Sequence, residues 1–186
     1  ALIVIRGMVS PRSINAKHLM DVFRQTAPLG VATIGQTMVL LVAGIDLSVS
    51  AVITLTNVLA ASIMAGGNDT IGLAVFVCLL VAAAIGVING LLVATARIPA
   101  FIVTLAVSSV IQGAYMVYTR GSPTGKIAPA FRVVSEGWIA GAFPWSGVVW
   151  LVILLAISMM LKRTVMGRRV YATGGNERAT WISGTR

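Results

Sequence analysis

The stretch IGLAVFVCLLVAAAIGVINGLLVATA, Ile71–Ala96, decides the fold class of this chain. It runs for 26 residues without a charged side chain. A helix rises about 1.5 Å per residue, so about 20 apolar residues cross the roughly 30 Å hydrocarbon core of a bilayer. Arg97, Ile98 and Pro99 follow, and proline cannot continue a helix. The stretch therefore predicts a transmembrane helix that ends at residue 96.

The composition extends this prediction to the rest of the chain. Of the 186 residues, 58% are hydrophobic and 10% are charged, whereas soluble domains have about 45–50% and about 25%. A soluble fold of this length could not bury so much apolar surface in one core. Further apolar stretches lie at residues 1–9, 28–43, 49–65, 100–118 and 145–161. We predict an all-α, polytopic transmembrane helix bundle with six spans in residues 1–161, the first of them truncated.

Several of these spans are short for a bilayer, and glycines interrupt them. Short, broken helices are tolerated where neighbouring helices or a water-filled cavity satisfy the freed backbone groups. This favours a transporter-like bundle over a simple anchor. The polar residues 13–27 are expected to hold at most a short interfacial helix, and residues 119–135 are expected to form a loop. The chain has no initiating Met, so we expect it to be a fragment of a longer subunit.

The charges are few and mostly basic, with fourteen Lys plus Arg against five Asp plus Glu and a formal charge of +9. They lie mostly between or beside apolar runs, where they meet water, membrane lipid or a partner. No basic helix with interleaved aromatics is present, so nucleic acid is not an expected partner. Charge counting barely separates the two sides of the membrane, although Lys162, Arg163, Arg168 and Arg169 favour a cytoplasmic tail at residues 162–186.

Catalytic and cofactor sites are not expected. Cys78 and His18 are the single residues of their kinds, which leaves too few ligands for a zinc site and too few groups for a catalytic dyad. The segment GSPTGK at residues 121–126 is not a phosphate loop. Such a loop has four residues between its glycines and Ser or Thr after the Lys, whereas this segment has three and Ile127. We predict no enzyme activity, no metal and no cofactor.

Asp46 in GIDLS, residues 44–48, is the most informative single residue. A carboxylate between two apolar runs is costly to bury and usually faces a bundle interior or water. We expect a helix break here, with Asp46 capping a helix whose first turn begins at Leu47. An architectural role is favoured over direct contact with a substrate. Asp46 and Ser48 are thus candidates for the helix break or for a transport pathway.

Three more polar residues, Asn57, Asn89 and Gln112, lie inside apolar spans. Each must bond to another helix, to backbone or to water, and contacts between helices are favoured over lining of a pathway. Gly86 and Gly90 form a G-x-x-x-G pattern, which by default indicates close helix packing.

The tail GRRVYATGGNERATWISG, residues 167–184, predicts a short helix. Two glycines at 174 and 175 are expected to break the chain, Asn176 is a good N-cap and Glu177 favours the positive end of the helix dipole. Gly184 can end the helix, whose apolar side chains include Trp181 and Ile182. Such a helix beside a membrane either docks a partner or lies among the lipid headgroups, and these residues do not separate the two.

Four segments in chain order resemble the permeases of ribose-, xylose- and arabinose-type ABC importers. They are GIDLSVS at residues 44–50, INGLLVA with RIPAFIVTL within residues 88–105, YTRGSP at 118–123 and the tail at 167–184. The related branched-chain amino-acid permeases share the broad fold and lack GIDLS. Ser50 stands here where the family usually has glycine, and Gln112 and Trp181 stand where basic residues are common.

The resemblance implies a subunit of roughly ten helices that forms a homodimer or heterodimer with a second permease copy. It further implies two cytoplasmic ATP-binding subunits and a periplasmic sugar-binding protein as partners. The tail helix resembles the coupling helix that sits in a groove of the ATPase, which also puts the tail in the cytoplasm. The implied coupling positions are Gly174, Gly175, Asn176, Glu177, Ala179, Ser183 and Gly184.

The predicted function is that of a bacterial inner-membrane permease subunit in an ATP-driven, binding-protein-dependent importer of a monosaccharide. The first alternative is the same architecture importing a nucleoside, an autoinducer or a branched-chain amino acid. The second is an ion-coupled secondary transporter. That class calls for a buried ionisable cluster, for which only Asp46 qualifies.

Overall fold

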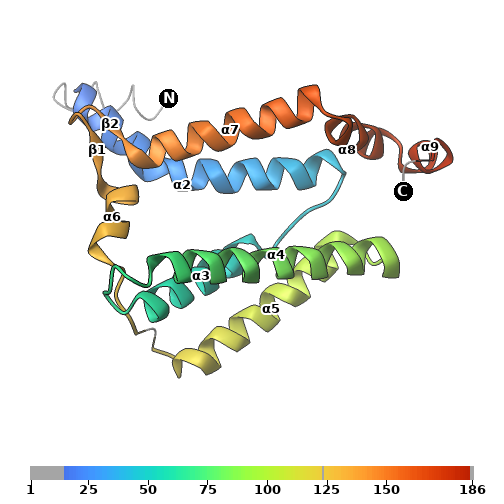
Figure 1. Cartoon of the computed structure of the whole chain (residues 1–186). Helices are drawn as coiled ribbons and strands as arrows, with labels where there is room; N and C mark the ends of the chain where they lie inside the picture. The colour runs from blue at the N-terminus through green and yellow to red at the C-terminus, as the bar shows by residue number, and fades with distance from the viewer. Residues whose placement is uncertain (1–14, 123, 185–186) are drawn as a thin grey trace, which may run out of the picture.

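The computed structural model describes residues 15–122 and 124–184. Within them the chain forms eight helices and one two-stranded hairpin, which confirms the predicted all-α class (Figure 1). The predicted apolar stretch at residues 1–9 lies outside the described residues. The elements are α2 (Ala16–Leu41), α3 (Val49–Met64), α4 (Ile71–Ala96), α5 (Ala100–Thr119), α6 (Pro129–Glu136), β1 (Trp138–Ile139), β2 (Phe143–Pro144), α7 (Trp145–Arg163), α8 (Val165–Gly175) and α9 (Glu177–Ile182).

The helices form two layers (Figure 1). One layer pairs α2 with α7, and the other contains α3, α4 and α5. At one end of the molecule, α6 and the hairpin lead from the second layer back to the first. At the opposite end α7 continues into α8 and α9, so the turn after α3 and the tail lie at opposite ends (Figure 1). This arrangement agrees with spans that alternate in direction.

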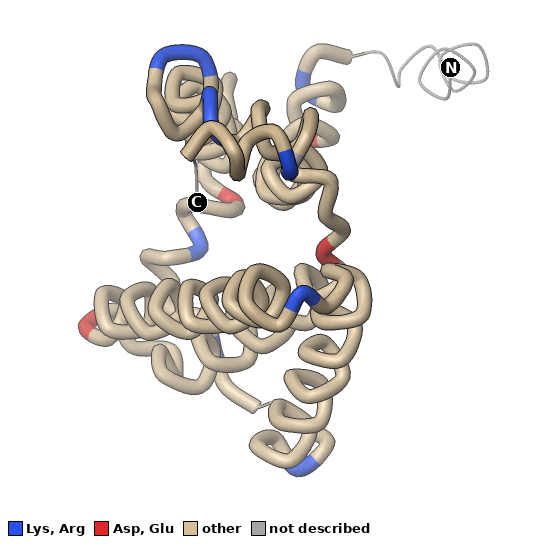
Figure 2. Tube along the Cα trace, turned by 90° about the vertical axis from the view of Figure 1, so that its right-hand side faces the viewer, with Lys and Arg blue, Asp and Glu red and all other residues tan. Residues whose placement is uncertain are grey.

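Three described helices, α4, α5 and α7, are long and apolar enough to cross a membrane. The helices α3, α4 and α5 carry no Lys, Arg, Asp or Glu, and the charged residues gather elsewhere on the chain (Figure 2). The bounds of α4 and α5 follow the predicted stretches to within one residue. Arg97 and Arg120 end them with φ of 54° and 52°, a left-handed conformation that stops a helix.

The polar segment before Pro28 is helical, which differs from the expectation of a short interfacial helix. Residues 16–41 form one continuous helix with Pro28 in its interior. A proline inside a helix donates no hydrogen bond to the carbonyl four residues earlier, here that of Arg24. The hydroxyl of Ser146 in α7 donates to this Arg24 carbonyl at 3.2 Å. The freed acceptor is therefore satisfied by the neighbouring helix, and α2 continues through the proline.

Aromatic side chains hold α2 against α7. The ring of Phe23 lies 5.6 Å from those of Phe143 and Trp150, centroid to centroid. Gly30 and Gly147 are packed so closely against Trp150 and Phe23 that a Cβ at either position would overlap the ring. Such edge and tilted aromatic pairs add about 0.5–1.5 kcal/mol each beyond the area they bury. This contact fixes the first layer.

Helix α6 occupies the end of residues 119–135, which were predicted to form a loop, and extends to Glu136; its start packs on the turn between α3 and α4. Met64, Ala74 and Ala128 form a buried cluster there. Backbone bonds join the two segments: Gly66 N donates to Lys126 O at 2.8 Å, and Lys126 N donates to Ala61 O at 3.2 Å. These contacts come from residues about 60 positions apart, so no local pattern predicts them.

Candidate functional site

The segment at residues 42–48 interrupts the helical structure between α2 and α3 (Figure 1). Ala43, with φ of 58°, turns the chain after α2, and an extended stretch follows. The start of α3 lies beside the interior of α4, as the contact between Ser48 and Asn89 shows. Asn89 lies seven residues before Ala96, the last residue of α4, which is about 10 Å along the helix axis. The break therefore lies inside the bundle and not at its rim.

Thr104 of α5 supports this extended backbone. Its hydroxyl oxygen accepts a hydrogen bond from Leu47 N at 3.0 Å and lies 3.3 Å from the carbonyl oxygen of Ile45. Thr104 is buried. Non-helical backbone at membrane depth needs such partners, since each unsatisfied group is costly there. The sequence analysis did not single out Thr104. Its signal in the sequence is a hydroxyl group within the apolar stretch 100–118, and its contact with GIDLS is seen only in the structure.

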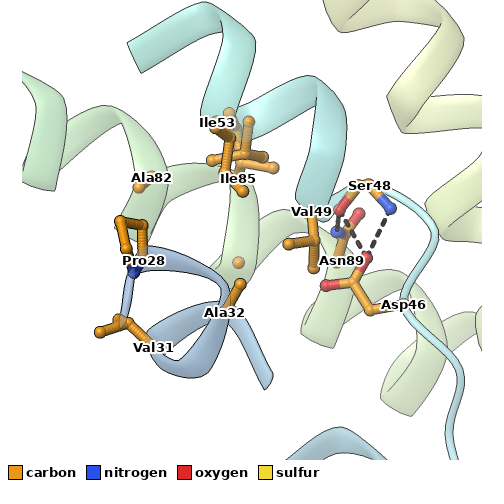
Figure 3. Close-up of a pocket in the computed structure, with 12 residues that line it drawn as sticks. Pro28, Val31, Ala32, Asp46, Ser48, Val49, Ile53, Ala82, Ile85 and Asn89 are labelled. Carbon is orange, nitrogen blue, oxygen red and sulfur yellow. Dashed lines mark hydrogen bonds between the residues drawn. The ribbon is translucent and has the colours of Figure 1, made fainter. Parts of the chain in front are cut away.

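Asp46, Ser48 and Asn89 form a chain of hydrogen bonds (Figure 3). One carboxylate oxygen of Asp46 accepts from Ser48 N at 2.7 Å and from Ser48 Oγ at 2.6 Å. The amide nitrogen of Asn89 donates to Ser48 Oγ at 3.0 Å. Ser48 and Asn89 are buried, with 2% and 8% of their surface exposed. The structure thus brings together three of the five predicted helix-break and pathway residues.

The expected cap of α3 by Asp46 is wrong by two positions. The helix begins at Val49 and not at Leu47, and Ser48 occupies the N-cap without a side-chain capping bond. Asp46 instead accepts from the backbone N–H two residues on, an Asx-turn, which competes with helix formation. The residue fixes the break itself.

A cavity of about 280 Å³ lies between α2, α3 and α4, next to this polar chain (Figure 3). Most of its wall is apolar, and its polar groups come from Asp46, Ser48 and Asn89. The other lining residues are Pro28, Val31, Ala32, Val49, Val52, Ile53, Ala82, Ile85 and Gly86. Pockets for small molecules commonly combine such an apolar lining with a few polar groups at fixed positions. Because α2 belongs to one layer and α3 and α4 to the other, the cavity opens where the layers meet.

The other polar candidates lie elsewhere. Asn57 is exposed on α3, and Gln112 donates to Ser108 Oγ at 3.2 Å within its own helix. Neither makes the expected contact with another described helix, and neither lines the cavity. The expected close packing at Gly86 and Gly90 is not made by any described helix, since a Cβ at either would meet no atom within 4 Å. Only Asn89 forms the predicted contact between helices.

The tail forms two helices where one was predicted. Gly174 and Gly175 do not break the chain but end α8, and the break falls at Asn176. As predicted, Asn176 caps α9: its side-chain oxygen accepts from Ala179 N at 2.9 Å. Ser183 is the C-cap of α9, and Gly184 follows with φ of +82°, the conformation that favours glycine after a helix. Trp181 and Ile182 are 66% and 72% exposed.

Gly174 is the point where the tail contacts the spanning helices. A Cβ at this position would overlap the carbonyl oxygen of Leu41 and lie 2.8 Å from its carbonyl carbon. Leu41 is the last residue of α2 and directly precedes the segment 42–48. Glycine therefore lets α8 contact the end of α2. The segment that holds Asp46 follows directly after this end.

The family described as the permease component of the branched-chain amino acid transport system matches residues 18–186. The chain belongs to this family of transport permeases. With its membrane-length apolar helices, it is a multi-pass protein of the bacterial inner membrane.

Within that family the chain is similar to sugar permeases, as the sequence motifs predicted. It is 38% identical over 196 residues to the ribose import permease protein RbsC of Escherichia coli (strain K12), which covers 98% of this chain and 58% of that protein. It is 34% identical over 185 residues to the ribose import permease protein RbsC of Bacillus subtilis (strain 168), with 98% and 57% covered. The D-allose transport system permease protein AlsC of Escherichia coli (strain K12) is 29% identical over 184 residues, with 98% and 56% covered. The chain spans a little over half the length of these relatives, and no solved structure matches it.

Proposed function

We propose that this chain is part of the membrane permease subunit of an ATP-driven, binding-protein-dependent importer of a monosaccharide. The observation that carries the proposal is its similarity, over 98% of its length, to permeases whose names specify ribose and allose. The subunit provides the pathway and has no catalytic activity of its own. Its partners are a cytoplasmic ATP-binding subunit, a periplasmic sugar-binding protein and a second permease copy.

The cavity beside Asp46, Ser48 and Asn89 is the proposed part of the pathway. It lies where two helical layers meet, and transporters alternate access by moving such groups of helices against each other. Its volume of about 280 Å³ is close to the lower end of the range of about 300–1,000 Å³ for small-molecule pockets. A broken helix beside the cavity supports the assignment, because irregular backbone at membrane depth is tolerated where it lines a cavity.

The tail at residues 162–186 is the proposed cytoplasmic region, and α9 is the proposed coupling helix. Two observations support this role. The apolar side chains of Trp181 and Ile182 are exposed and can enter a groove of a partner. The neighbouring helix α8 contacts the end of α2 through Gly174, so a push on the tail reaches the segment that holds Asp46. Closure of the ATPase pair would thereby change the cavity.

Uptake by the complete importer in proteoliposomes tests the proposal. The full-length permease, its ATP-binding subunit and its binding protein are reconstituted, and uptake of radiolabelled D-ribose and D-allose is measured. We expect uptake to require two components. The first is ATP on the side of the membrane where the ATP-binding subunit lies, and the second is the binding protein. Uptake of leucine without any sugar would assign the chain to amino-acid import. Uptake driven by an ion gradient without ATP would assign it to the secondary transporters.

A further inference from the structure

We propose that Asn89 Oδ1 accepts a hydrogen bond from a hydroxyl group of the transported solute, and that Asp46 and Ser48 position the Asn89 amide for this contact. The site formed in this way takes a neutral, polyhydroxylated molecule. The inference rests on the proposed function, because the cavity must belong to the transport pathway. To the proposed function the inference adds the residue that contacts the solute and the chemical reason why a solute of this class is selected.

The direction of the hydrogen-bond chain follows from the chemistry of its first member. An ionised carboxylate only accepts hydrogen bonds, so the single hydroxyl proton of Ser48 must go to Asp46, 2.6 Å away. Ser48 Oγ then has only lone pairs left for Asn89. The group of Asn89 that lies 3.0 Å from Ser48 Oγ must therefore be its NH₂ and not its carbonyl oxygen. Asp46 thus sets the orientation of an amide on another helix.

This orientation leaves Asn89 Oδ1 as an acceptor without a donor. The atom is buried and has no hydrogen-bond partner among the described residues. Asn89 nevertheless lines the cavity, and 8% of the residue's surface is exposed. A buried polar group without a partner is destabilising. When the helices around the cavity part, an O–H group of a solute can supply the missing donor.

The charges of the cavity select the class of solute. Among the twelve residues that line it, Asp46 is the only ionisable one, and no described residue forms an ion pair with Asp46. An anionic solute would find no cation there and would be repelled by Asp46. The second carboxylate oxygen of Asp46 points away from Ser48, toward Val49 and Ala32 (Figure 3). Acceptors therefore dominate the polar end, and they match a solute rich in hydroxyl donors.

A double-mutant cycle between Asn89 and the solute tests the inference. Proteoliposomes carry the complete importer with a saturating amount of its binding protein loaded with D-ribose or with a monodeoxyribose. The ratio of the transport rates for the two sugars is measured in the wild type and in Asn89→Ala. Contributions of the binding protein are the same in both and cancel. We expect the wild type to favour ribose over one deoxy analogue by about three- to tenfold, as for one neutral hydrogen bond, and Asn89→Ala to reduce this ratio to about one.

Two further variants make the result specific. Ser48→Ala keeps the Asn89 amide but lets it rotate. The ratio of the ribose and deoxyribose transport rates should therefore fall partway toward one. This variant replaces Asn89→Ala in the test if Asn89→Ala does not fold. Thr95→Val is the matched control, because the Thr95 hydroxyl is exposed and bonds only to Leu91 O within α4. It should leave the ratio as in the wild type.

Three outcomes would overturn the inference. The first is an equal preference in Asn89→Ala and the wild type for every analogue, which means that water or another segment satisfies Oδ1. The second is a wild type that transports all deoxy analogues as fast as ribose. The third is the absence of any ATP-driven sugar uptake by the wild type, which removes the proposed function as well. In the first two outcomes ATP-driven ribose uptake persists, so the proposed function stands while the role of Asn89 falls.

Discussion

Replacing Gly174 by alanine probes the contact between the tail and the spanning helices. The new Cβ would overlap Leu41 O and lie 2.8 Å from the Leu41 carbonyl carbon, whereas carbon atoms in favourable contact are about 3.5–4.0 Å apart. The obstacle is backbone at the end of α2, which cannot rotate away as a side chain could. The helix α8 must therefore move away from α2 by about 1 Å, judged from these distances.

Two effects of opposite sign determine the magnitude. Overpacking costs about 1–3 kcal/mol, while alanine gains up to about 1 kcal/mol over glycine in a helix. Gly175→Ala is the matched stability control, because no atom lies within 4 Å of its Cβ position and its φ is not positive. The control has the helix-propensity gain without the overlap. The difference between the two variants therefore isolates the overlap, at about 1–3 kcal/mol.

Hydrogen–deuterium exchange of the detergent-solubilised full-length permease measures this difference. If local opening of α8 limits exchange, the protection of its amides in Gly174→Ala should fall about 10- to 100-fold below that in Gly175→Ala. The amides of α4, which belongs to the other layer (Figure 1), should be equally protected in both variants. Equal protection of α8 in the two variants would refute the reasoning, because it would mean that α8 does not rest on the Leu41 carbonyl.

Three further substitutions test other parts of the fold by thermal unfolding or exchange in detergent. Thr104→Val leaves Leu47 N without its partner and should destabilise the protein by about 1–3 kcal/mol; an unchanged melting temperature would contradict the role of Thr104. Gly125→Ala should detach the loop before α6, since Gly125 has φ of +129° and its Cβ would lie 2.5 Å from the Ala61 carbonyl carbon; faster exchange at Lys126 N is the readout, and unaltered protection would speak against it. Asn176→Ala removes the cap of α9 and should cost about 1 kcal/mol, seen as faster exchange confined to α9, whereas a change spread over α7 would be inconsistent with a local cap.

The predicted spans that agree with the structure are those with strong local signals. The stretch of α4 ends before Arg97-Ile98-Pro99 and that of α5 before the glycine-bearing segment after Tyr118, and both helices follow these bounds closely. The cap at Asn176 was likewise predicted, because the residue and the N–H it accepts from are three positions apart. In these three cases the signal operates within a few residues of the helix end and is visible in the sequence.

Several predictions that failed depended on distant residues, whereas the predicted cap by Asp46 failed locally, because Asp46 accepts from Ser48 N in an Asx-turn. The extension of α2 before Pro28 relies on Ser146, 122 positions from the carbonyl that it satisfies. The position of α6 relies on the turn after α3, and the packing of Gly174 relies on Leu41. The apolar pattern of the chain contains no information on which helix meets which, because lipid-facing and helix-facing positions are both apolar in a membrane.

The sequence by itself determined that this protein crosses a membrane, where its long apolar helices lie and, through GIDLS and the tail motif, which family it belongs to. Only the tertiary structure decided that Asp46 fixes the break instead of capping α3, and that Ser48 connects it to Asn89 on the wall of a cavity. The physical reason is that composition and helix signals act along the chain, whereas a hydrogen bond acquires its direction and its unpaired acceptor only when separate helices meet.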